Sequence, residues 1–437
     1  MQPFTSYQDA LDFLFQQLPM YQRHGKRAFR PGLENIKFFL EKMGNPHLQF
    51  QSIHIAGTNG KGSTAHIIAA LLQAKDLKVG MYTSPHYADF RERIKINGQL
   101  IPEEKVLHFV NQYHDLILET EASYFEMTVA MAFDYFAQAE MDIAVIETGL
   151  GGLLDSTNVI QPLLSIITNI SYDHMDILGS TLPEIAFQKA GIIKKSTPVV
   201  IGETQAETAP VFKSRALEEQ SPIRFADEII TIESLQVEQA AQCLKVNKEG
   251  KLWLDQLRFD LLGDYQIQNL KTALAAITLL PNYTFEEAEI RKGLAHIRQS
   301  SYFIGRWQVL GEQPLIITDA GHNEAGIQLS MEQISSYDYD QLHLVIGFST
   351  GKDHQKLVDL MPDEATYYLT QPTVPRRLPV AELEPLFSEK KVDYTLYPQS
   401  DKAIQAALNQ ARPKDLIFIG GSSFMVADAL HYFATNA

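Results

Sequence analysis

A glycine-rich stretch early in the chain carries the clearest chemical signal of the sequence. Residues 53–56 alternate as in a short strand, and three glycines and Lys61 follow within residues 57–62. Apolar residues then recur at helical spacing over 67–72, so a helix is expected to begin at about Lys61. A glycine-rich turn at a helix N-terminus points backbone N–H groups at an anion, and a lysine there adds a cation. The stretch therefore predicts a cradle for a triphosphate.

This stretch departs from the usual phosphate-loop pattern, which has four residues between its first glycine and Gly-Lys and a hydroxyl directly after the lysine. Here two residues stand between Gly57 and Gly60, and the hydroxyl comes one place late, at Ser63. The alternative is a tight turn with an incidental lysine. We favour the phosphate site, because a strand, a turn and a helix are expected in the order that its mechanism requires.

A carboxylate ends one of the most apolar stretches of the chain. Residues 141–147 form a nearly continuous apolar run, as expected for a parallel strand covered on both faces, and the run ends in Glu147. An acid at the tip of such a strand, beside a phosphate loop, is the arrangement that holds Mg²⁺ in phosphate-loop enzymes. The alternative is an acid that is simply solvated. We favour the magnesium ligand.

Two more polar side chains follow expected strands. Ser84 comes after the strand expected at 77–82, and His174, flanked by aspartates, comes after the strand expected at 163–168. Ligands bind at the carboxyl ends of strands in parallel sheets. A Ser-Pro pair alone usually means a turn, and a lone histidine is more often structural. From the residues alone, both interpretations stay open.

A lysine lies on the apolar face of a predicted helix. Residues 181–184 have the spacing of a capping box with an early proline, and the helix is expected to run to about residue 190. Lys189 shares a face with Ile185, so it points inward. An inward lysine has a lowered pKa and unusual reactivity. The residues alone favour the simpler alternative, a lysine whose ammonium reaches solvent.

The remaining elements must position these side chains. A chain of 437 residues exceeds the roughly 250–300 residues at which a single core stops growing, so two or three domains are expected. Strands and helices alternate in the first part, and residues 224–260 are typical of antiparallel hairpins. Helices are expected at 270–280 and 285–297. Beyond a boundary near residue 299, strands and helices alternate again, as in a second α/β domain.

The predicted fold class is α/β. A phosphate-loop, doubly wound, mostly parallel sheet domain with an appended small β-sheet is expected over residues 1–298, and a smaller Rossmann-like α/β domain over residues 299–437. The second domain lacks Gly-x-Gly-x-x-Gly at its first strand, so a dinucleotide is not indicated. That strand ends in a polar cluster with Asp319 and His322. Arg306 lies just after the boundary, where it either reaches a phosphate or forms a surface salt bridge.

Composition argues against several classes of protein. The net charge of −16 argues against a nucleic-acid surface, and the single Cys243 rules out an internal disulfide. The N-terminus has no basic region followed by a long apolar run, and no stretch approaches the roughly 18 apolar residues of a membrane span. We therefore expect a cytoplasmic protein that binds neither nucleic acid nor membrane.

Several motifs match one family at once. They are Ala-Gly-Thr-Asn-Gly-Lys-Gly-Ser at 56–63, Thr-Ser-Pro-His at 83–86, Glu-Arg-Ile at 92–94, Tyr-Phe-Glu at 124–126, Glu-Thr-Gly-Leu-Gly-Gly at 147–152, Asp-Ser-Thr-Asn at 155–158, Asp-His at 173–174, Lys-Ala-Gly-Ile at 189–192 and Asp-Ala-Gly-His-Asn at 319–323. In this order they resemble folylpolyglutamate synthase and its bifunctional dihydrofolate synthase relatives, in the Mur ligase superfamily. The late hydroxyl at Ser63 is itself a feature of that family.

The resemblance implies a role for each candidate residue. Residues that would bind ATP are Asn59, Gly60, Lys61, Gly62, Ser63, Asn269, Arg306, Asp319 and His322. Residues that would hold two Mg²⁺ ions are Ser84, Glu147 and His174. Residues that would bind the folate are Arg30, Pro31, Gly32, Phe125, Glu126 and Asp155. Lys189 would be carbamylated and would act in catalysis with Lys61, Glu147 and His174.

The resemblance also implies a reaction. ATP phosphorylates the terminal carboxylate of a folate, and the amine of L-glutamate attacks the acyl phosphate. The partners would be these small molecules, and we assume a monomer. Leu153 stands where the family often has arginine, which leads us to favour polyglutamylation alone over a bifunctional enzyme that also uses dihydropteroate. Gly321 and Glu324 also depart from the family pattern, but Asp319 and His322 remain.

Other classes fit less well. A GTPase-type switch needs Asn-Lys-x-Asp, and the Asn-Lys pair at 247–248 is followed by Glu-Gly. A non-catalytic relative should have lost Lys61, Glu147, His174 or Lys189, and all four are present. A Mur ligase that acts on cell-wall precursors should lack the combination of motifs at 124–126 and 189–192.

Overall fold

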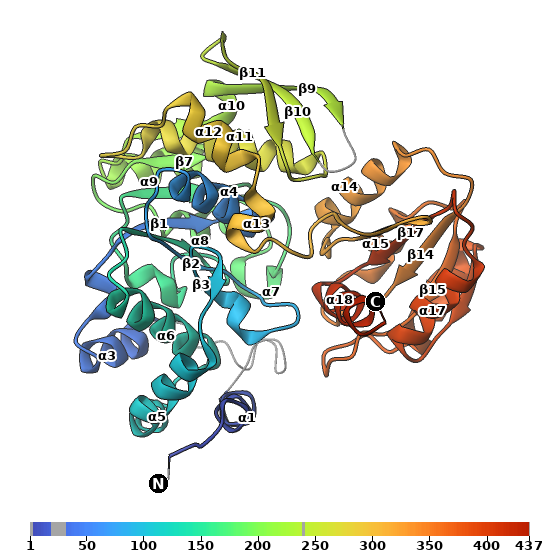
Figure 1. Ribbon diagram of the computed structural model, residues 1–437, viewed down its shortest axis with the longest axis horizontal. Coiled ribbons are helices and arrows are strands. Elements are labelled where there is room, and N and C mark those ends of the chain that lie inside the picture. Colours follow the sequence, from blue (N-terminus) through green and yellow to red (C-terminus); the bar gives the residue numbers. More distant parts are fainter. Residues whose placement is uncertain (1–2, 19–31, 238–240, 437) are drawn as a thin grey trace. The chain divides into compact units, whose positions relative to one another are not determined.

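The computed structural model describes residues 3–18, 32–237 and 241–436. The chain divides into two compact units (Figure 1). The first unit is Met1–Leu261 with Gln266–Phe303, and the second is Leu262–Tyr265 with Ile304–Ala437. Each unit has its own sheet and its own apolar core, so each is described by itself.

The first unit alternates strands and helices along the chain. Its elements are α1 (Tyr7–Gln17), α3 (Glu34–Lys42), η2 (Pro46–Leu48), β1 (Gln51–Ala56), α4 (Lys61–Gln73), β2 (Val79–Tyr82), η3 (Phe90–Arg93), β3 (Ile94–Ile96), β4 (Gln99–Leu100), α5 (Glu103–Glu119), α6 (Tyr124–Gln138), β5 (Ile143–Glu147), η4 (Ser156–Val159), β6 (Leu164–Ile167), α7 (Met175–Leu178), α8 (Leu182–Ala190), β7 (Val199–Ile201), α9 (Ala209–Glu218), β8 (Ile223–Phe225), α10 (Ala226–Ile229), β9 (Ile230–Val237), β10 (Gln242–Lys248), β11 (Lys251–Phe259), α11 (Tyr265–Leu279), α12 (Glu287–Leu294) and α13 (Ile297–Ser301).

Within the described residues, the main sheet of the first unit has eight strands in the order β4-β3-β2-β5-β1-β6-β7-β8. The strands from β2 to β8 in this order pair in parallel, whereas β3 and β4 pair antiparallel at one edge. The chain passes from β5 to β6 across β1, so the strand order reverses beside β1. Ligands bind outside the carboxyl ends of strands at such a reversal. The prediction of a mostly parallel sheet is confirmed.

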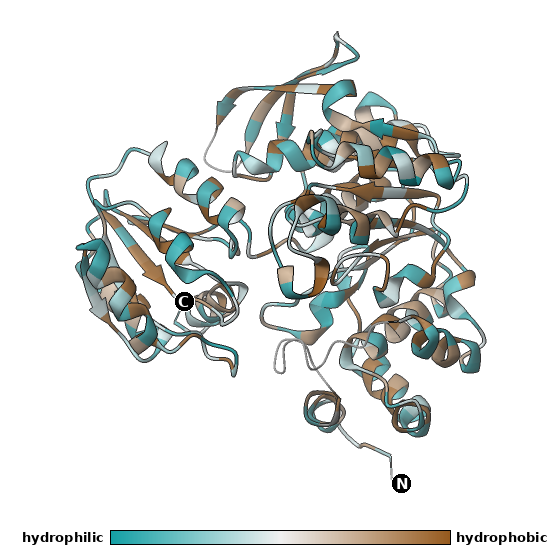
Figure 2. Ribbon diagram, turned by 180° about the vertical axis from the view of Figure 1, so that it is seen from behind, coloured by the Kyte–Doolittle hydropathy of each residue, from teal (hydrophilic) through white to brown (hydrophobic). Residues whose placement is uncertain are grey.

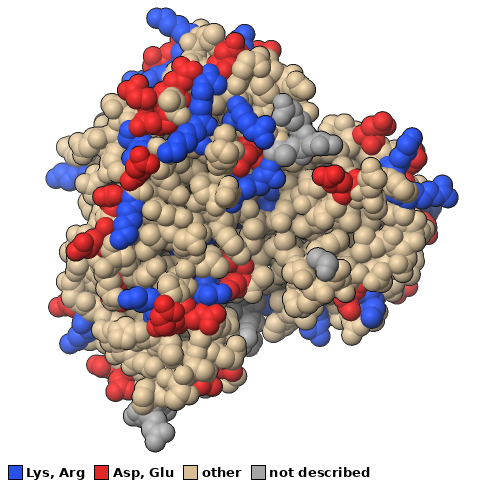
Figure 3. All heavy atoms as spheres, viewed as in Figure 1, with Lys and Arg blue, Asp and Glu red and all other residues tan. Residues whose placement is uncertain are grey.

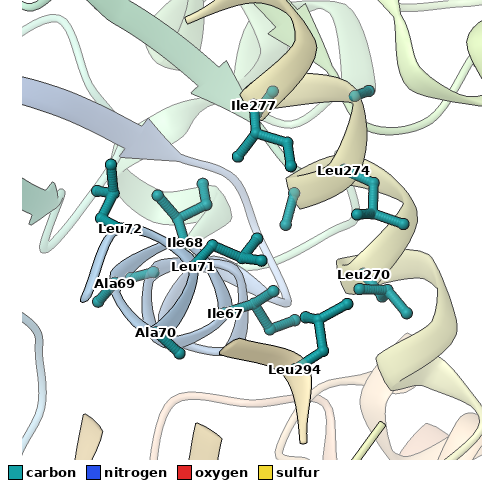
Figure 4. Packing of buried hydrophobic residues seen from close by; sticks show 14 of the residues in the cluster. Ile67, Ile68, Ala69, Ala70, Leu71, Leu72, Leu270, Leu274, Ile277 and Leu294 are labelled. Atoms are coloured by element: carbon teal, nitrogen blue, oxygen red, sulfur yellow. The ribbon is translucent and has the colours of Figure 1, made fainter. Parts of the chain in front are cut away.

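Helices cover both faces of this sheet, because successive side chains along a strand point to opposite sides. Ile53 and Ile55 of β1 lie in an apolar cluster with α4, α11 and α12, whereas Ala144 and Ile146 of β5 lie in a second cluster with α5 and α6. The central strands are mostly hydrophobic (Figure 2), and Leu71 of α4 shares an apolar cluster with Leu274 of α11 and Leu294 of α12 (Figure 4). The predicted doubly wound arrangement is confirmed.

The predicted hairpins are confirmed, and the helix expected at 285–297 is present but shorter. β9, β10 and β11 pair as a separate antiparallel sheet, and the predicted capping box begins α8. The expected helix is α12, which ends at Leu294, and a second helix, α13, begins at Ile297. The chain leaves helical geometry at His296, where φ is −139°, and the Asp260 carboxylate accepts a hydrogen bond from the Arg298 N–H at the start of α13. An acceptor from another segment therefore starts the second helix.

The second unit is a smaller α/β layer structure, as predicted. Its elements are β12 (Gln308–Glu312), β13 (Leu315–Thr318), α14 (Glu324–Ser335), β14 (Leu342–Ile346), α15 (His354–Asp359), β15 (Thr366–Leu369), α16 (Val380–Lys390), β16 (Asp393–Leu396), α17 (Ser400–Gln410), β17 (Leu416–Gly420) and α18 (Ser423–Thr435). Its described strands are ordered β12-β13-β17-β14-β15-β16, and all pair in parallel except β12. α14, α15 and α16 cover one face, and α17 and α18 cover the other.

On the face in Figure 3, acidic and basic side chains of the first unit are interspersed rather than gathered by sign. In the part of the chain that the structure describes, no helix has both the length and the apolar character needed to cross a membrane.

Replacing Leu71 by alanine tests the packing of α4 on α11 and α12. Leu71 is fully buried, so Leu71→Ala is expected to lower the free energy of unfolding by about 2–5 kcal/mol. The measurement is urea unfolding followed by circular dichroism. Leu217 is 81% exposed, so Leu217→Ala is the control and should change stability by less than about 0.5 kcal/mol. Equal effects of the two changes would contradict this account of the core.

Candidate active site

The phosphate loop, Gly57–Gly60, lies between β1 and α4 and bends as glycine allows. Gly57 has a φ of 150° and Gly60 a φ of 82°, which other residues rarely adopt. A Cβ atom on Gly57 would lie 1.9 Å from the Thr168 Oγ1, and one on Gly60 would lie 2.1 Å from the Asn269 Oδ1. The helix begins where predicted, and α11 brings the candidate residue Asn269 against the loop.

The first turn of α4 adds a cation and two buried hydroxyls to this loop. The Lys61 Nζ donates to the carbonyl oxygens of Gly57 and Thr58, both at 3.2 Å, so the ammonium lies over the loop. Among the described residues, the buried hydroxyls of Ser63 and Thr64 have no hydrogen-bond partner. Because buried polar groups normally have a partner, the Ser63 hydroxyl is suited to donate a hydrogen bond to a phosphate oxygen or to bind a cation.

Ser84 and Glu147 meet at the carboxyl ends of the neighbouring strands β2 and β5. Glu147 is 2% exposed, and its Oε2 accepts a hydrogen bond from the Ser84 N–H at 3.1 Å. β5 also pairs with β1, in which Ile55 is the partner of Glu147, so the carboxylate lies at the same edge as the phosphate loop. The structure thus brings two of the three candidate metal ligands together.

His174, the third candidate ligand, follows β6 at the same edge of the sheet. It has a left-handed φ of 50° just before α7, and its Nε2 lies 3.8 Å from the Asp173 Oδ1. Over residues 3–18, 32–237 and 241–436, no three His, Cys, Asp or Glu side chains gather so that they could hold a metal ion. The candidate set therefore needs the Ser84 hydroxyl beside the carboxylate and the imidazole.

Lys189 is buried on α8 and reaches the phosphate loop. Its Nζ donates to the Gly57 carbonyl at 2.7 Å. Burial, followed by the positive charge of Lys61, lowers the pKa of Lys189 from 10.5 to about 7, while Asp173 and Asp155 act in the opposite direction. The interpretation that the residues alone favoured, a lysine that reaches solvent, is wrong. A substantial fraction of this amine is neutral at pH 7.

The candidate substrate residue Asp155 organises the loop after β5. Its carboxylate accepts hydrogen bonds from the N–H groups of Gly149 at 2.9 Å, Leu150 at 2.8 Å and Thr157 at 3.0 Å. Burial raises the pKa of Asp155, and these hydrogen bonds oppose that rise. The carboxylate therefore has a structural task, and its contact with substrate stays a prediction.

Of the other candidate substrate residues, Phe125 and Glu126 have structural contacts. The Phe125 ring packs against Gly149, where a Cβ would lie 2.4 Å from the ring. Glu126 is buried, closes the capping box of α6 and accepts from the Asn35 Nδ2 at 3.1 Å. Gly32 has a φ of 126°. The two candidates that lie outside the described residues are Arg30 and Pro31. Substrate binding by this group stays a prediction.

In the second unit, Asp319 centres a hydrogen-bonded cluster at the carboxyl end of β13. Its carboxylate accepts from two hydroxyls and two backbone N–H groups at 2.6–3.2 Å, which belong to Tyr265, Ser330, Trp307 and Gly321. The His322 Nδ1 lies 2.9 Å from the Ala320 carbonyl oxygen, and Arg306 precedes β12. The cluster is well ordered by its own contacts, and its binding of ATP stays a prediction.

Sequence reasoning missed the residues that hold the phosphate loop in shape. Thr58 and Asn59 of the loop form hydrogen bonds with three residues that follow β6, namely Thr168, Asn169 and Ser171. The signal was present, because polar residues directly after an apolar strand of a parallel sheet stand where ligand-binding residues are expected. The sequence did not show that β6 pairs with β1, which is what brings these residues to the phosphate loop.

The chain matches two models of protein families. Residues 55–277 match the Mur ligase middle domain, and residues 305–423 match the Mur ligase glutamate ligase domain. The chain is 31% identical over 440 residues to the dihydrofolate synthase/folylpolyglutamate synthase of Bacillus subtilis, covering 97% of this chain and 98% of that relative. This chain belongs to the folylpolyglutamate synthase/dihydrofolate synthase family of Mur ligases.

Other members of the folylpolyglutamate synthase family differ in length. The folylpolyglutamate synthase of Lacticaseibacillus casei is 33% identical over 405 residues, with 90% of this chain and 92% of that relative covered. A probable bifunctional folylpolyglutamate synthase/dihydropteroate synthase of Haloferax volcanii is 32% identical over 447 residues. The match covers 97% of this chain, which spans about half (50%) of that longer relative.

Solved structures of the family share the fold. The folylpolyglutamate synthase of Mycobacterium tuberculosis complexed with ADP has a TM-score of 0.89 and 27% identity, with 98% of each chain covered. A bifunctional folylpolyglutamate synthase/dihydrofolate synthase with manganese, AMPPNP and L-glutamate bound has a TM-score of 0.83 and 26% identity, with 99% of each chain covered. The predicted fold class is confirmed over nearly the whole chain.

Replacing Lys189 by methionine tests the buried neutral amine. Between about pH 7 and pH 10.5 the unfolded lysine holds a proton that the folded one lacks, so this residue lowers stability as the pH falls through that window. Lys189→Met should therefore raise the free energy of unfolding at pH 7, on the order of a few kcal/mol, and much less at pH 10.5. The measurement is urea unfolding at both pH values in CO₂-free buffer. An equal increase in the free energy of unfolding at pH 7 and pH 10.5 would contradict the lowered pKa of Lys189.

Proposed function

We propose that this protein is an ATP-dependent ligase that adds L-glutamate to the terminal carboxylate of (tetrahydro)folate and its polyglutamates, releasing ADP and phosphate. The observation that carries the proposal is the Gly57 carbonyl, which accepts hydrogen bonds from both Lys61 and Lys189 at the sheet edge where Glu147 ends β5. A phosphate-binding lysine, a buried amine and a buried acid fit phosphoryl transfer to a carboxylate. Membership in the family suggests the substrate class.

The proposed reaction joins a carboxylate and an amine in two steps. A folate carboxylate oxygen attacks the γ-phosphorus of ATP, and the bond to ADP breaks, which gives an acyl phosphate. The amine of L-glutamate then attacks the acyl carbon, an amide forms, a proton is lost and phosphate leaves. Lys61 and the N–H groups at the start of α4 hold the phosphates. The chain mainly positions the reactants and stabilises charge.

The donors at the strand ends fit a divalent cation. The buried Glu147 carboxylate and the Ser84 hydroxyl are the hard oxygen ligands that Mg²⁺ prefers, and His174 follows at the same edge. Bound Mg²⁺ neutralises charge on the phosphoryl group that is transferred. A relative with manganese and AMPPNP bound supports a divalent metal together with the nucleotide. We propose two such ions.

We also propose that Lys189 is carbamylated. The neutral amine attacks the carbon of CO₂, an N–C bond forms and a proton leaves, so an inward cation becomes an anion. The lowered pKa of about 7 keeps the reactive neutral form available, and the positive charge of Lys61 favours an anion beside it. The change would remove the repulsion between the two lysines and provide oxygen ligands near the metal.

Other assignments are proposed from the resemblance. Residues proposed to contact ATP are Asn59, Gly60, Gly62, Ser63, Asn269, Arg306, Asp319 and His322. Residues proposed to contact the folate are Arg30, Pro31, Gly32, Phe125, Glu126 and Asp155. The ranges 1–298 and 299–437 are proposed as the ATP-binding domain and the glutamate ligase domain. A monomer in the cytoplasm stays a prediction.

Dihydropteroate is the second candidate acceptor. The Bacillus subtilis relative is named dihydrofolate synthase/folylpolyglutamate synthase, which favours dihydropteroate, whereas the Lacticaseibacillus casei relative is named folylpolyglutamate synthase alone. Leu153 favours polyglutamylation, because an arginine there would offer a cation to an acidic substrate. The backbone at Leu153 packs closely on the end of α8, since a Cβ on Gly191 would lie 2.3 Å from the Leu153 Cα.

ADP release with two acceptors tests the proposed function. In the presence of ATP, Mg²⁺ and L-glutamate, tetrahydrofolate should support the release of ADP and dihydropteroate should not. Lys61→Met should reduce kcat by about 100-fold or more, since it removes a cation from the phosphates. Lys402 lies on the surface of the second unit, and Lys402→Met is the matched control. Turnover with both acceptors would support the bifunctional alternative, and turnover with neither would contradict the folate assignment.

Carbon-13 NMR tests the carbamate on Lys189. Protein equilibrated with ¹³C-bicarbonate should show a carbamate signal that Lys189→Met lacks. Because only the neutral amine reacts, the rate of carbamate formation at a fixed concentration of dissolved CO₂ should rise as the pH passes through about 7. Lys195→Met is the control, since Lys195 is an exposed lysine close by in the sequence. A fully active protein without the signal would contradict the proposal.

A further inference from the structure

The phosphate loop is held by the segment that leaves β6, residues Thr168–Ser171. The Thr58 N–H donates to the Asn169 carbonyl at 3.0 Å, and the Asn59 N–H donates to the Asn169 Oδ1 at 3.0 Å. The Thr168 hydroxyl donates to the Asn59 carbonyl at 2.6 Å. The backbone N–H groups of Thr58 and Asn59 therefore stabilise the conformation of the loop. The N–H groups at the start of α4 are the ones expected to bind phosphates.

The Thr58 side chain adds a reciprocal pair of hydrogen bonds. Its hydroxyl donates to the Ser171 carbonyl at 3.2 Å and accepts from the Ser171 N–H at 3.0 Å. A hydroxyl that donates to and accepts from the same residue is fixed in orientation, so it ties the two segments together. We call Thr58, Thr168, Asn169 and Ser171 the loop clamp.

The clamp continues directly into the candidate metal ligand. His174 comes three residues after Ser171 in the same segment. On its other side this segment is fixed by Gln205, whose amide donates to the Ile170 carbonyl at 2.9 Å and accepts from the Ile170 N–H at 3.2 Å. The segment is thus held at both sides, and Thr58 is the loop residue whose side chain bonds to it.

Glycine at position 57 allows the close approach on which the clamp depends. A Cβ there would lie 1.9 Å from the Thr168 Oγ1 and 3.1 Å from the Thr168 backbone nitrogen. The loop and the segment after β6 therefore lie in direct backbone contact. A shift of the phosphate loop therefore also moves the segment after β6.

We propose that Thr58 and Asn169 are positioning residues that couple the binding of nucleotide phosphates at the phosphate loop to the binding of a divalent cation at His174. This inference rests on the proposed function for the identity of the two ligands. Phosphates that order the loop order the segment of His174 through the clamp, and a cation held by His174 orders the loop in return. Such coupling is reciprocal, so Mg²⁺ should tighten nucleotide binding by the factor by which nucleotide tightens Mg²⁺ binding.

The experiment measures the affinity for AMPPNP by isothermal titration calorimetry, with and without Mg²⁺, in the whole 437-residue chain. Thr58→Val keeps the shape of the side chain and removes both hydrogen bonds of the hydroxyl. It should cut the Mg²⁺-dependent gain in affinity by about 10–100-fold, the usual effect of removing a group that orients a ligand. Thr58→Ser restores the hydroxyl and should restore most of the gain. Asn169→Ala should act in the same direction as Thr58→Val.

Two controls separate coupling from damage to the fold. Thr120→Val removes a hydroxyl that donates to the Leu116 carbonyl at 2.7 Å at the end of α5, and it should leave the Mg²⁺-dependent gain unchanged. In a His174→Ala background, Thr58→Val should cause no further loss of that gain, because the clamp acts through the segment of His174. Circular dichroism and melting temperature show whether each variant is folded.

Three results would overturn the inference. They are a Thr58→Val protein with the wild-type gain, a folded Thr58→Ser protein as impaired as Thr58→Val, and a wild-type protein whose affinity for AMPPNP is the same with and without Mg²⁺. None of these measurements uses a folate. A wild-type protein that shows the coupling but ligates no glutamate would therefore contradict the proposed function alone.

Discussion

The proposed chemistry depends on one constraint, which is that the Gly57 carbonyl accepts hydrogen bonds from two lysines. Lys61 reaches it from the helix that follows the loop, and Lys189 reaches it from α8, far along the chain. Burial disfavours the charged form of Lys189, and the positive charge of Lys61 beside the same oxygen disfavours it further. The fold therefore lowers the pKa of Lys189 to about 7 at the loop over which Lys61 lies. One backbone oxygen thus brings the buried amine and the phosphate-binding lysine together.

The topology of the sheet explains why this oxygen lies beside the acid and the histidine. β1 stands between β5 and β6, so the loop after β1 has the ends of both strands as neighbours. Glu147 is the last residue of β5, and Ser84 and His174 come shortly after β2 and β6. Each polar residue needs only to follow its strand to reach the common edge. The hydrogen bonds of Thr58 then add a direct link between two of these strand ends.

Local pattern predicted the elements well, because strand and helix periodicity are properties of the chain itself. The start of α4, the apolar strand that ends in Glu147 and the capping box of α8 were all visible in the sequence. What pattern did not reveal depends on distant segments. The burial of Lys189 requires the loop that covers it, the break before α13 requires Asp260, and the role of Asn169 requires β6 beside β1. Asp155 shows the opposite case. The resemblance implies that this carboxylate binds substrate, but in the structure it accepts hydrogen bonds from backbone N–H groups of its own loop.

The central claim is that a folate carboxylate is activated by phosphorylation at the Gly57 loop. The most direct measurement uses tetrahydrofolate labelled with ¹⁸O in its terminal carboxylate, together with ATP, Mg²⁺ and L-glutamate. If an acyl phosphate forms, one labelled oxygen passes to the phosphate that leaves, because the bond that breaks in the second step is the acyl carbon–oxygen bond. Mass spectrometry of the phosphate released in the first addition should show one ¹⁸O for each labelled tetrahydrofolate that gains a glutamate, since later additions use the unlabelled carboxylate of the new glutamate. Product formation with unlabelled phosphate would contradict the account.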